Sequence, residues 1–323
     1  MKRILILHTG GTIAMSEDKE TGKVMPNATN PLLAFSAMFK DNVDLIVEDI
    51  FQIPSPHITA KDMLLLKERI EQGVKMEQID GVVITHGTDT LEETAYFLDI
   101  TTDVSIPIVL TGAMRSSNEI GADGLYNFQS AIHVAASDVA KDKGVLVVMN
   151  DEIHTARYVT KTHTTNVATF RTPTFGPIGI IAKNKVLFFQ ELITLEKHPM
   201  TAILHDVQLV KAYAGMDSTI FHALAETKMD GLVIEALGAG NLPPATLPGI
   251  QNLIAKKIPI VLVSRCFNGI AQDAYDYEGG GKQLQEMGVI FTNGLNGQKA
   301  RIKLLVALSQ TTDLTIIKQF FAD

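Results

Sequence analysis

The chain of 323 residues contains only one cysteine, Cys266. A single cysteine cannot form a disulfide within the chain, and no spacing of cysteine and histidine matches a zinc site. Because Cys266 follows the apolar run at residues 258–263, we expect a small buried side chain rather than a nucleophile. The sequence gives no indication of a bound metal.

Long apolar runs and stripes of basic residues are also missing. No segment approaches the ~18 apolar residues that cross a membrane, and the four apolar residues between Arg3 and His8 are too few for a signal peptide. The 28 basic residues are outnumbered by 36 acidic ones, which gives a net charge of -8. We therefore expect a cytoplasmic protein that binds neither nucleic acid nor membrane.

The length exceeds that of one usual hydrophobic core, so two domains are expected. Up to about residue 150, buried-strand patterns alternate with helical ones, which is typical of a parallel sheet covered on both faces. The expected strands are at residues 4–7, 44–50, 81–84, 107–110 and 144–149. Helix starts are expected after Thr59, with Asp62 in the first turn, at Thr90, and near Gly124.

Residues 153–189 instead show short strand patterns broken by glycine and proline, which indicate hairpins. Alternation returns later, with expected strands at residues 208–213, 231–236 and 258–263. We predict an α/β protein with a larger N-terminal, doubly wound, mainly parallel sheet and a smaller C-terminal α/β domain. The predicted boundaries are a catalytic domain at 1–189, a linker at 190–207 and the second domain at 208–323.

Two of the predicted strands end at glycine and threonine. The loops are residues 8–14 (HTGGTIA) and 85–90 (THGTDT). Ligands bind at the carboxyl ends of strands in such sheets, so two threonine hydroxyls could reach one crevice. By itself, Thr12 is more typical of a turn that caps the next segment than of a nucleophile, because a threonine becomes a nucleophile only beside a proton acceptor. Neither phosphate-binding glycine spacing is present.

Other polar residues near these loops have structural as well as catalytic interpretations. Asp89 could be a helix cap, and His86, next to a buried strand, is more typical of a packed histidine than of a base. Lys161 by its spacing alone is typical of a surface charge, although beside Asp89 it could accept a proton. The polar residues 15–23 are interpreted as a mobile loop that either closes over a ligand or simply connects.

The two loops resemble the signature segments of the bacterial L-asparaginases, threonine amidohydrolases of the cytoplasmic type. The resemblance covers Thr9–Ala14, His86–Thr90 with Glu92-Glu93-Thr94, a third block at residues 150–162 and 168–170, and residues 298–301. It implies a homotetramer built as a dimer of dimers, with no cofactor.

By this resemblance Thr12 is the nucleophile that forms an acyl-enzyme, and Thr88, Asp89 and Lys161 form a second catalytic triad. Backbone N–H groups around Thr12 and Thr88 are the oxyanion donors it suggests. The implied substrate-binding residues are Gly11, Ser55, Gly87, Thr88, Asp89, Ala113, Asn241 and Tyr275.

Two departures from the family pattern concern this pocket. Many relatives have a tyrosine in the mobile loop, but here no tyrosine precedes Tyr96, and Pro56 follows Ser55 where many relatives have glutamine. Tyr275 aligns with a glutamate that reaches in from the partner subunit of secreted relatives. We hypothesise that Tyr275 supplies the missing hydroxyl beside Thr12.

The function implied is hydrolysis of the side-chain amide of L-asparagine to L-aspartate and ammonia. Three alternatives remain open: a glutaminase-asparaginase, a D-asparagine amidohydrolase, or a non-catalytic amino-acid sensor with the same pocket. A subunit related to transfer-RNA-dependent amidotransferases is disfavoured, because the chain has neither a long extra domain nor a basic surface.

Overall fold

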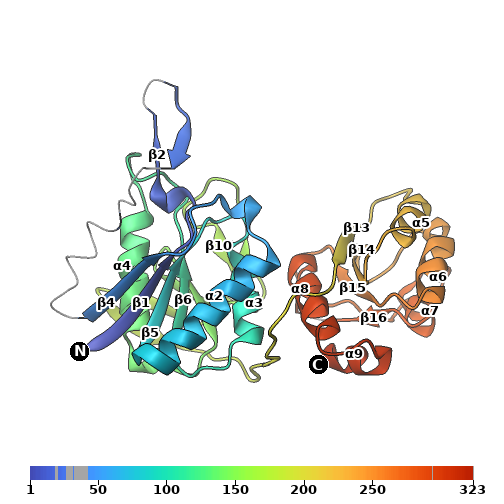
Figure 1. Cartoon of the computed structure of the whole chain (residues 1–323). Coiled ribbons are helices and arrows are strands. Elements are labelled where there is room, and N and C mark those ends of the chain that lie inside the picture. Colours follow the sequence, from blue (N-terminus) through green and yellow to red (C-terminus); the bar gives the residue numbers. More distant parts are fainter. Residues whose placement is uncertain (19–20, 27–31, 33–42, 293, 323) are drawn as a thin grey trace. The chain divides into compact units, whose positions relative to one another are not determined.

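The computed structural model describes residues 1–18, 21–26, 32, 43–292 and 294–322. The chain divides into two compact units, Met1–Pro199 and Met200–Asp323 (Figure 1). The division falls inside the segment predicted as the linker. The helical pattern expected between the first two strands lies mostly outside the described residues.

The first unit is built on an eight-stranded mixed sheet. Its strand order is β12-β11-β8-β7-β6-β5-β1-β4. The five parallel strands are β4 (Val43–Asp49), β1 (Lys2–His8), β5 (Gly81–Thr85), β6 (Ile108–Thr111) and β7 (Val145–Met149). The antiparallel strands that follow are β8 (Glu152–Thr155), β11 (Gly179–Ala182) and β12 (Lys185–Phe188). The prediction of βα units followed by hairpins is confirmed.

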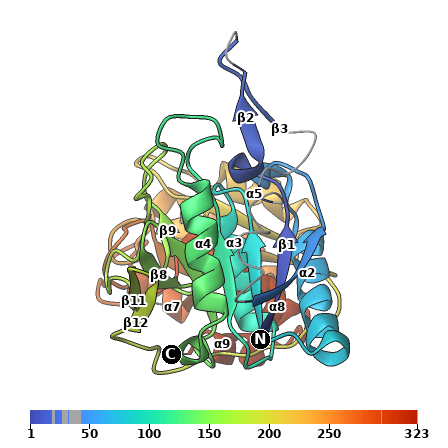
Figure 2. The ribbon, with the colours of Figure 1, turned by 90° about the vertical axis from the view of Figure 1, so that its left-hand side faces the viewer.

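Helices cover both faces of this sheet. Helix α4 (Gly124–Ala135) packs on one face, with Phe128 and Ile132 against Ile4 and Val83. Helices α2 (Ala60–Gln72) and α3 (Leu91–Thr101) lie on the other face (Figure 2). Helix α2 begins as expected, because the Thr59 N–H donates to Asp62 Oδ2 at 2.8 Å. The doubly wound architecture is therefore confirmed.

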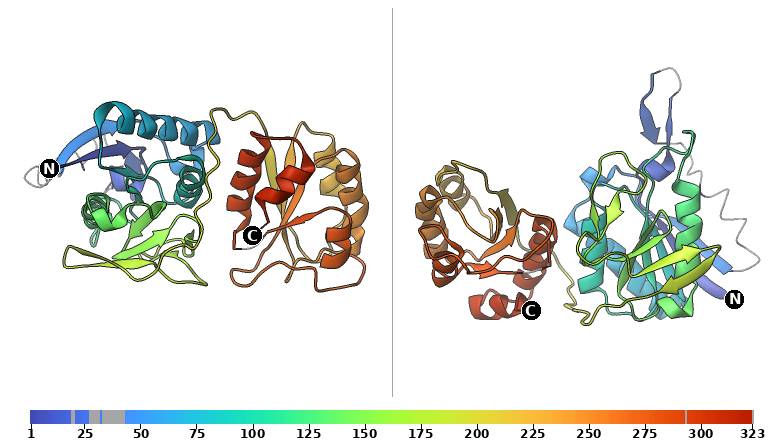
Figure 3. Two further views of the ribbon diagram at one scale, coloured as in Figure 1. Left: turned by 90° about the horizontal axis from the view of Figure 1, so that it is seen from below. Right: turned by 180° about the vertical axis from the view of Figure 1, so that it is seen from behind.

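The second unit has a parallel sheet of four strands among its described residues. They are β13 (Val207–Lys211), β14 (Gly231–Ala236), β15 (Ile260–Ser264) and β16 (Ile290–Phe291). Its helices are α5 (Thr219–Ala225), α6 (Leu247–Ala255), α7 (Gly281–Glu286), α8 (Gly297–Leu308) and α9 (Leu314–Phe320) (Figure 3). The first three strands were predicted, whereas β16 is too short to show a pattern.

Two local expectations need correction. Cys266 is exposed, not buried, because the chain leaves β15 after Ser264 and continues in an open loop. In the segment interpreted as a loop, β2 (Met15–Glu17) pairs with β3 (Val24–Pro26) as an antiparallel hairpin, while residues 19 and 20 lie outside the described part. None of the helices in the described residues is long and apolar enough to cross a membrane.

Candidate active site

The two glycine-threonine loops leave neighbouring strands and touch through their backbones. His8 at the end of β1 lies opposite Thr85 at the end of β5. Gly11 has a φ of +85°, and a Cβ added to it would lie 2.4 Å from the Cα of Gly87. Only glycine permits this approach at position 11. The contact brings the loop of Thr12, which starts a 3₁₀ turn over Thr12–Ala14, beside the loop of Thr88.

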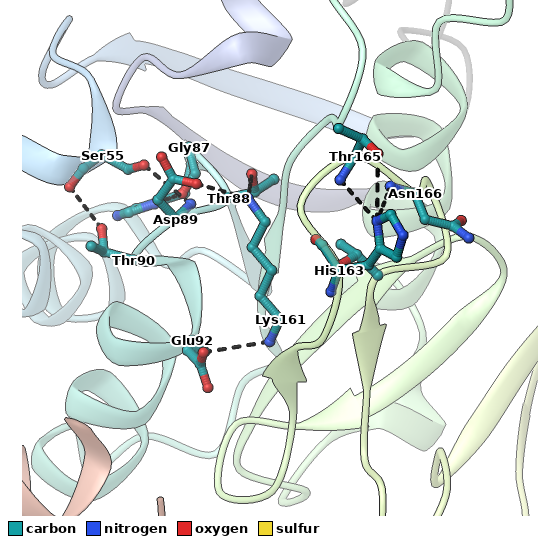
Figure 4. Close-up of polar contacts among 12 residues, drawn as sticks. Ser55, Gly87, Thr88, Asp89, Thr90, Glu92, Lys161, His163, Thr165 and Asn166 are labelled. Atoms are coloured by element: carbon teal, nitrogen blue, oxygen red, sulfur yellow. Dashed lines mark hydrogen bonds and ion pairs between the residues drawn. The ribbon is translucent and has the colours of Figure 1, made fainter. Parts of the chain in front are cut away.

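Thr88, Asp89 and Lys161 form a hydrogen-bonded cluster. Lys161 lies on the short strand β9 (Thr160–Lys161), and its Nζ donates to Thr88 Oγ1 at 2.9 Å (Figure 4). The same Nζ pairs with Asp89 Oδ1 at 2.7 Å. The Lys161 side chain is only 16% exposed, so Lys161 is not the surface charge that its spacing alone suggested. A hydroxyl, an amine and a carboxylate thus lie in one continuous chain of contacts.

Ser55 holds the Thr88 loop in place. It starts a 3₁₀ turn, and its Oγ accepts a hydrogen bond from the Asp89 N–H at 3.2 Å. Its carbonyl oxygen accepts from Thr90 Oγ1 at 2.8 Å. The Ser55 side chain also fills the space that a Cβ on Gly87 would need, since Ser55 Cβ would be 2.7 Å away. Ser55 therefore stabilises the loop whatever else it binds.

His86 is a packed residue and not a candidate base. Its ring is completely buried, with Nδ1 2.7 Å from the Gly87 carbonyl oxygen and Nε2 2.9 Å from Thr94 Oγ1. Because a carbonyl oxygen only accepts, Nδ1 carries the proton and Nε2 accepts from Thr94. Burial lowers the pKa of His86 to about 4, since the imidazolium would lose its hydration. The structural interpretation of His86 is confirmed.

Ala113 lies in the loop after β6, near the first residues of the Thr12 turn. A Cβ on Gly124 would be 2.9 Å from Ile13 Cγ1 and 3.2 Å from Ala113 Cβ, so both residues pack on the start of α4. The carboxylate of Asp123 accepts hydrogen bonds from the backbone N–H groups that follow Ala113 in the chain. Asp123 was missed in the sequence, although an aspartate directly before a helix is a recognisable signal.

Both units match one family over nearly their whole lengths. Residues 3–194 match the family described as "Asparaginase, N-terminal", and residues 206–321 match "Glutaminase/Asparaginase C-terminal domain". The chain belongs to the asparaginase family of enzymes. The resemblance read from the two threonine loops is confirmed by these matches.

Comparisons with individual asparaginases support this assignment. The chain is 37% identical to an L-asparaginase of Bacillus licheniformis, over 95% of this chain and 96% of that protein. It is 31% identical to a glutaminase-asparaginase of Pseudomonas fluorescens biotype A, over 99% and 90%. The crystal structure of a probable cytoplasmic L-asparaginase from Campylobacter jejuni matches with a TM-score of 0.88, 36% identity and 99% coverage of both chains.

Two residues suggested by the asparaginase resemblance lie in the second unit. Asn241 Oδ1 accepts from the Gly281 N–H at 3.1 Å, and the Asn241 backbone pairs with Leu237. Tyr275 is 49% exposed, and its ring centroid lies 5.7 Å from that of Tyr277. Both residues therefore belong to the second unit, whereas Thr12, Thr88, Asp89 and Lys161 all belong to the first.

Glu92 is a further residue of the cluster, to which the sequence assigned no role beyond its place in the resembling segment. A carboxylate in the first turn of α3 by itself indicates only a favourable interaction with the helix dipole. In the structure Glu92 Oε1 accepts from Thr160 Oγ1 at 3.1 Å and from the Lys161 N–H at 3.4 Å. No sequence signal links positions that are 68 or 69 residues apart. Among the described residues, no group of three or more histidine, cysteine or acidic side chains could hold a metal ion.

Proposed function

We propose that the protein hydrolyses the side-chain amide of L-asparagine to L-aspartate and ammonia, with Thr12 as the nucleophile. The observation that carries this proposal is the position of Lys161 Nζ, within hydrogen-bond distance of both Thr88 Oγ1 and Asp89 Oδ1. Thr88 and Asp89 of this cluster lie in the loop whose Gly87 backbone touches Gly11, next to Thr12. The asparaginase relatives support the same reaction.

In this mechanism the Thr12 oxygen attacks the amide carbon, and the negative oxygen that forms accepts hydrogen bonds from backbone N–H groups around Thr12 and Thr88. The proton of the Thr12 hydroxyl passes through Thr88 or a water to the amide nitrogen, the C–N bond breaks and ammonia leaves. Water then hydrolyses the threonine ester, which restores the Thr12 hydroxyl and releases L-aspartate. Lys161 donates to Thr88 Oγ1 and so stabilises charge as a proton moves from Thr88 or from water. Which threonine attacks first is decided by the variants below.

Substrate recognition uses groups near this cluster. Asp89 uses Oδ1 for Lys161, and its carboxylate is 60% exposed, which leaves Oδ2 for the α-ammonium group. Ser55, Ala113, Gly11 and Gly87 complete the proposed pocket in the first unit. Asn241 and Tyr275 would enter from a neighbouring subunit of a tetramer built as a dimer of dimers. We further propose a cytoplasmic location, because the similar Campylobacter jejuni protein is described as a probable cytoplasmic L-asparaginase.

The test is ammonia release from L-asparagine by the wild type and by Thr12→Ala, Thr88→Ala and Thr12→Ser. We expect both alanine variants to lose release and the serine variant, which keeps a hydroxyl, to recover part of it. Accumulation of the acyl-enzyme in Thr88→Ala alone would assign the first attack to Thr12. Thr101→Ala is the matched control, because Thr101 is buried and its hydroxyl donates to the Phe97 carbonyl within its own helix.

A glutaminase-asparaginase is the second candidate, favoured by the relatives of that name. Asparagine and glutamine differ by one methylene, which is worth ~1–3 kcal/mol in a pocket. Parallel assays with L-glutamine and D-asparagine separate these activities. No release from any of the three, together with tight binding, would instead support the amino-acid sensor and contradict the proposed reaction.

A further inference from the structure

The strand that carries Lys161 has little support of its own. Strand β9 is two residues long and, in the part of the chain that the structure describes, pairs only with the two-residue strand β10 (Phe170–Arg171), outside the eight-stranded sheet. A lysine side chain has four rotatable carbon bonds and loses much freedom when its end is held in one place. The position of Lys161 Nζ relative to Thr88 therefore depends on a contact that holds the Lys161 backbone in place.

Glu92 supplies a contact at that point. It lies in the first turn of α3, is 5% exposed, and accepts hydrogen bonds from Thr160 Oγ1 and from the Lys161 N–H. The segment 88–92 thus holds Lys161 at both ends, because Thr88 and Asp89 bind its Nζ while Glu92 binds its backbone. Figure 4 shows the extended Lys161 side chain between these two groups of contacts.

We propose that Glu92 is a positioning residue for Lys161. Through its bonds to Thr160 Oγ1 and to the Lys161 N–H it fixes the start of the lysine side chain, so that Nζ reaches Thr88 Oγ1. Helix α3 begins within two residues of Asp89, so a single rigid element sets both the origin and the target of that side chain. The inference rests on the proposed function for its kinetic readout only.

The first test is the kinetics of Glu92→Ala. Because a displacement of about 1 Å can cost ~100-fold in rate, we expect kcat for L-asparagine to fall about 10- to 100-fold. KM should change less than about 3-fold, since the substrate contacts remain. Glu92→Gln keeps an acceptor oxygen and should retain most of the activity. Thr160→Val removes one of the two bonds that Glu92 makes to residues 160 and 161, so its kcat should lie between those of Glu92→Gln and Glu92→Ala.

Asp99→Ala is the matched control. Asp99 is 6% exposed, lies on the same helix, and its Oδ1 accepts from the Val145 N–H at 2.7 Å. It therefore holds the backbone of β7, which does not carry Lys161. We expect Asp99→Ala to lower the melting temperature without changing kcat. Equal losses of kcat in Asp99→Ala and Glu92→Ala would show a general loss of packing and overturn the proposal.

The second test is a crystal structure of Glu92→Ala, which needs no assumption about the reaction. We expect the distance between Lys161 Nζ and Thr88 Oγ1 to exceed 3.5 Å, the limit of a hydrogen bond. An unchanged contact, or wild-type kcat in Glu92→Ala, overturns the proposal. A Glu92→Gln variant as slow as the alanine variant would overturn it too, since charge rather than position would then matter. If the wild type releases no ammonia, the proposed function fails and this distance alone decides.

Discussion

The two threonine loops leave adjacent parallel strands, yet they are held in different ways. Thr88 is 6% exposed, and its hydroxyl accepts from Lys161. Thr12 is partly exposed, and no residue that the structure describes bonds to its hydroxyl. Its loop is held by other residues, for example by the Thr9 hydroxyl, which donates to the Thr85 carbonyl at 3.0 Å, and by the Ala14 N–H, which donates to the Gly11 carbonyl at 2.9 Å.

This difference separates two tasks that a pair of similar loops can share. A hydroxyl with a bonded amine has its proton-transfer partner in place before any ligand arrives, which avoids reorganisation during reaction. A hydroxyl without a bonded partner, in a loop fixed by its other residues, is free to face a ligand. The comparison therefore supports the proposed roles of Thr12 as attacking group and of Thr88 as a member of the proton-transfer cluster.

Removal of the Lys161 amine should leave the Thr88 hydroxyl without its bonded amine and should have the largest effect on activity. We expect Lys161→Met to lower kcat about 10²- to 10⁴-fold, the usual contribution of a positioned acid-base group. Lys143→Met is the matched control, because Lys143 is 17% exposed and pairs with Glu191 in the same unit. Steady-state ammonia release measures both. A Lys161→Met enzyme as fast as the control would contradict the role of the cluster.

Gly11→Ala tests the backbone contact between the loops. The added Cβ meets Gly87 at a positive φ, so we expect a loss of about 3 kcal/mol in the free energy of unfolding together with a large loss of activity. Gly176→Ala separates the two causes, since Gly176 has a φ of +74° but nothing within 4 Å of an added Cβ. It should lose only about 1 kcal/mol. Urea unfolding measures both, and equal losses would mean that the collision is unimportant.

The smallest expected effect concerns pH, because each loop has a buried histidine at its start. Burial lowers the pKa of His8, as of His86, to about 4, although Asp49 opposes the shift at His8. Between pH 6.5 and 4 the unfolded chain binds protons that the folded chain does not, so stability falls as pH falls in this window. We expect a loss of about 2 kcal/mol between about pH 7 and 5.5.

Urea unfolding at several pH values measures this slope. His86→Gln should make the slope shallower, whatever its effect on absolute stability, because one of the histidines whose pKa is lowered by burial (His8, His86 and His133) no longer titrates. His57→Gln, at an exposed histidine of the same unit, is the matched control. A slope that is undiminished in a variant lacking both His8 and His86 would assign the pH dependence to other groups, such as His133.

The sequence alone determined the parallel strands, the later hairpins and the two loops, because these depend on local patterns of apolar residues, glycine and proline. It also identified the family from two short segments. Cys266 and the hairpin β2–β3 were predicted wrongly, since exposure after a strand and pairing within a polar segment depend on where the chain turns. The two-residue strands β9 and β16 have no pattern to detect.

Only the tertiary structure decided which polar groups meet. Lys161 is 73 residues from Thr88 in the chain, and its spacing alone predicted a surface charge. Its contact depends on where β9 lies against the start of α3, which the long-range bonds of Glu92 help to set. Local sequence specifies the conformation of each loop, whereas a contact between distant side chains exists only after the whole unit has packed.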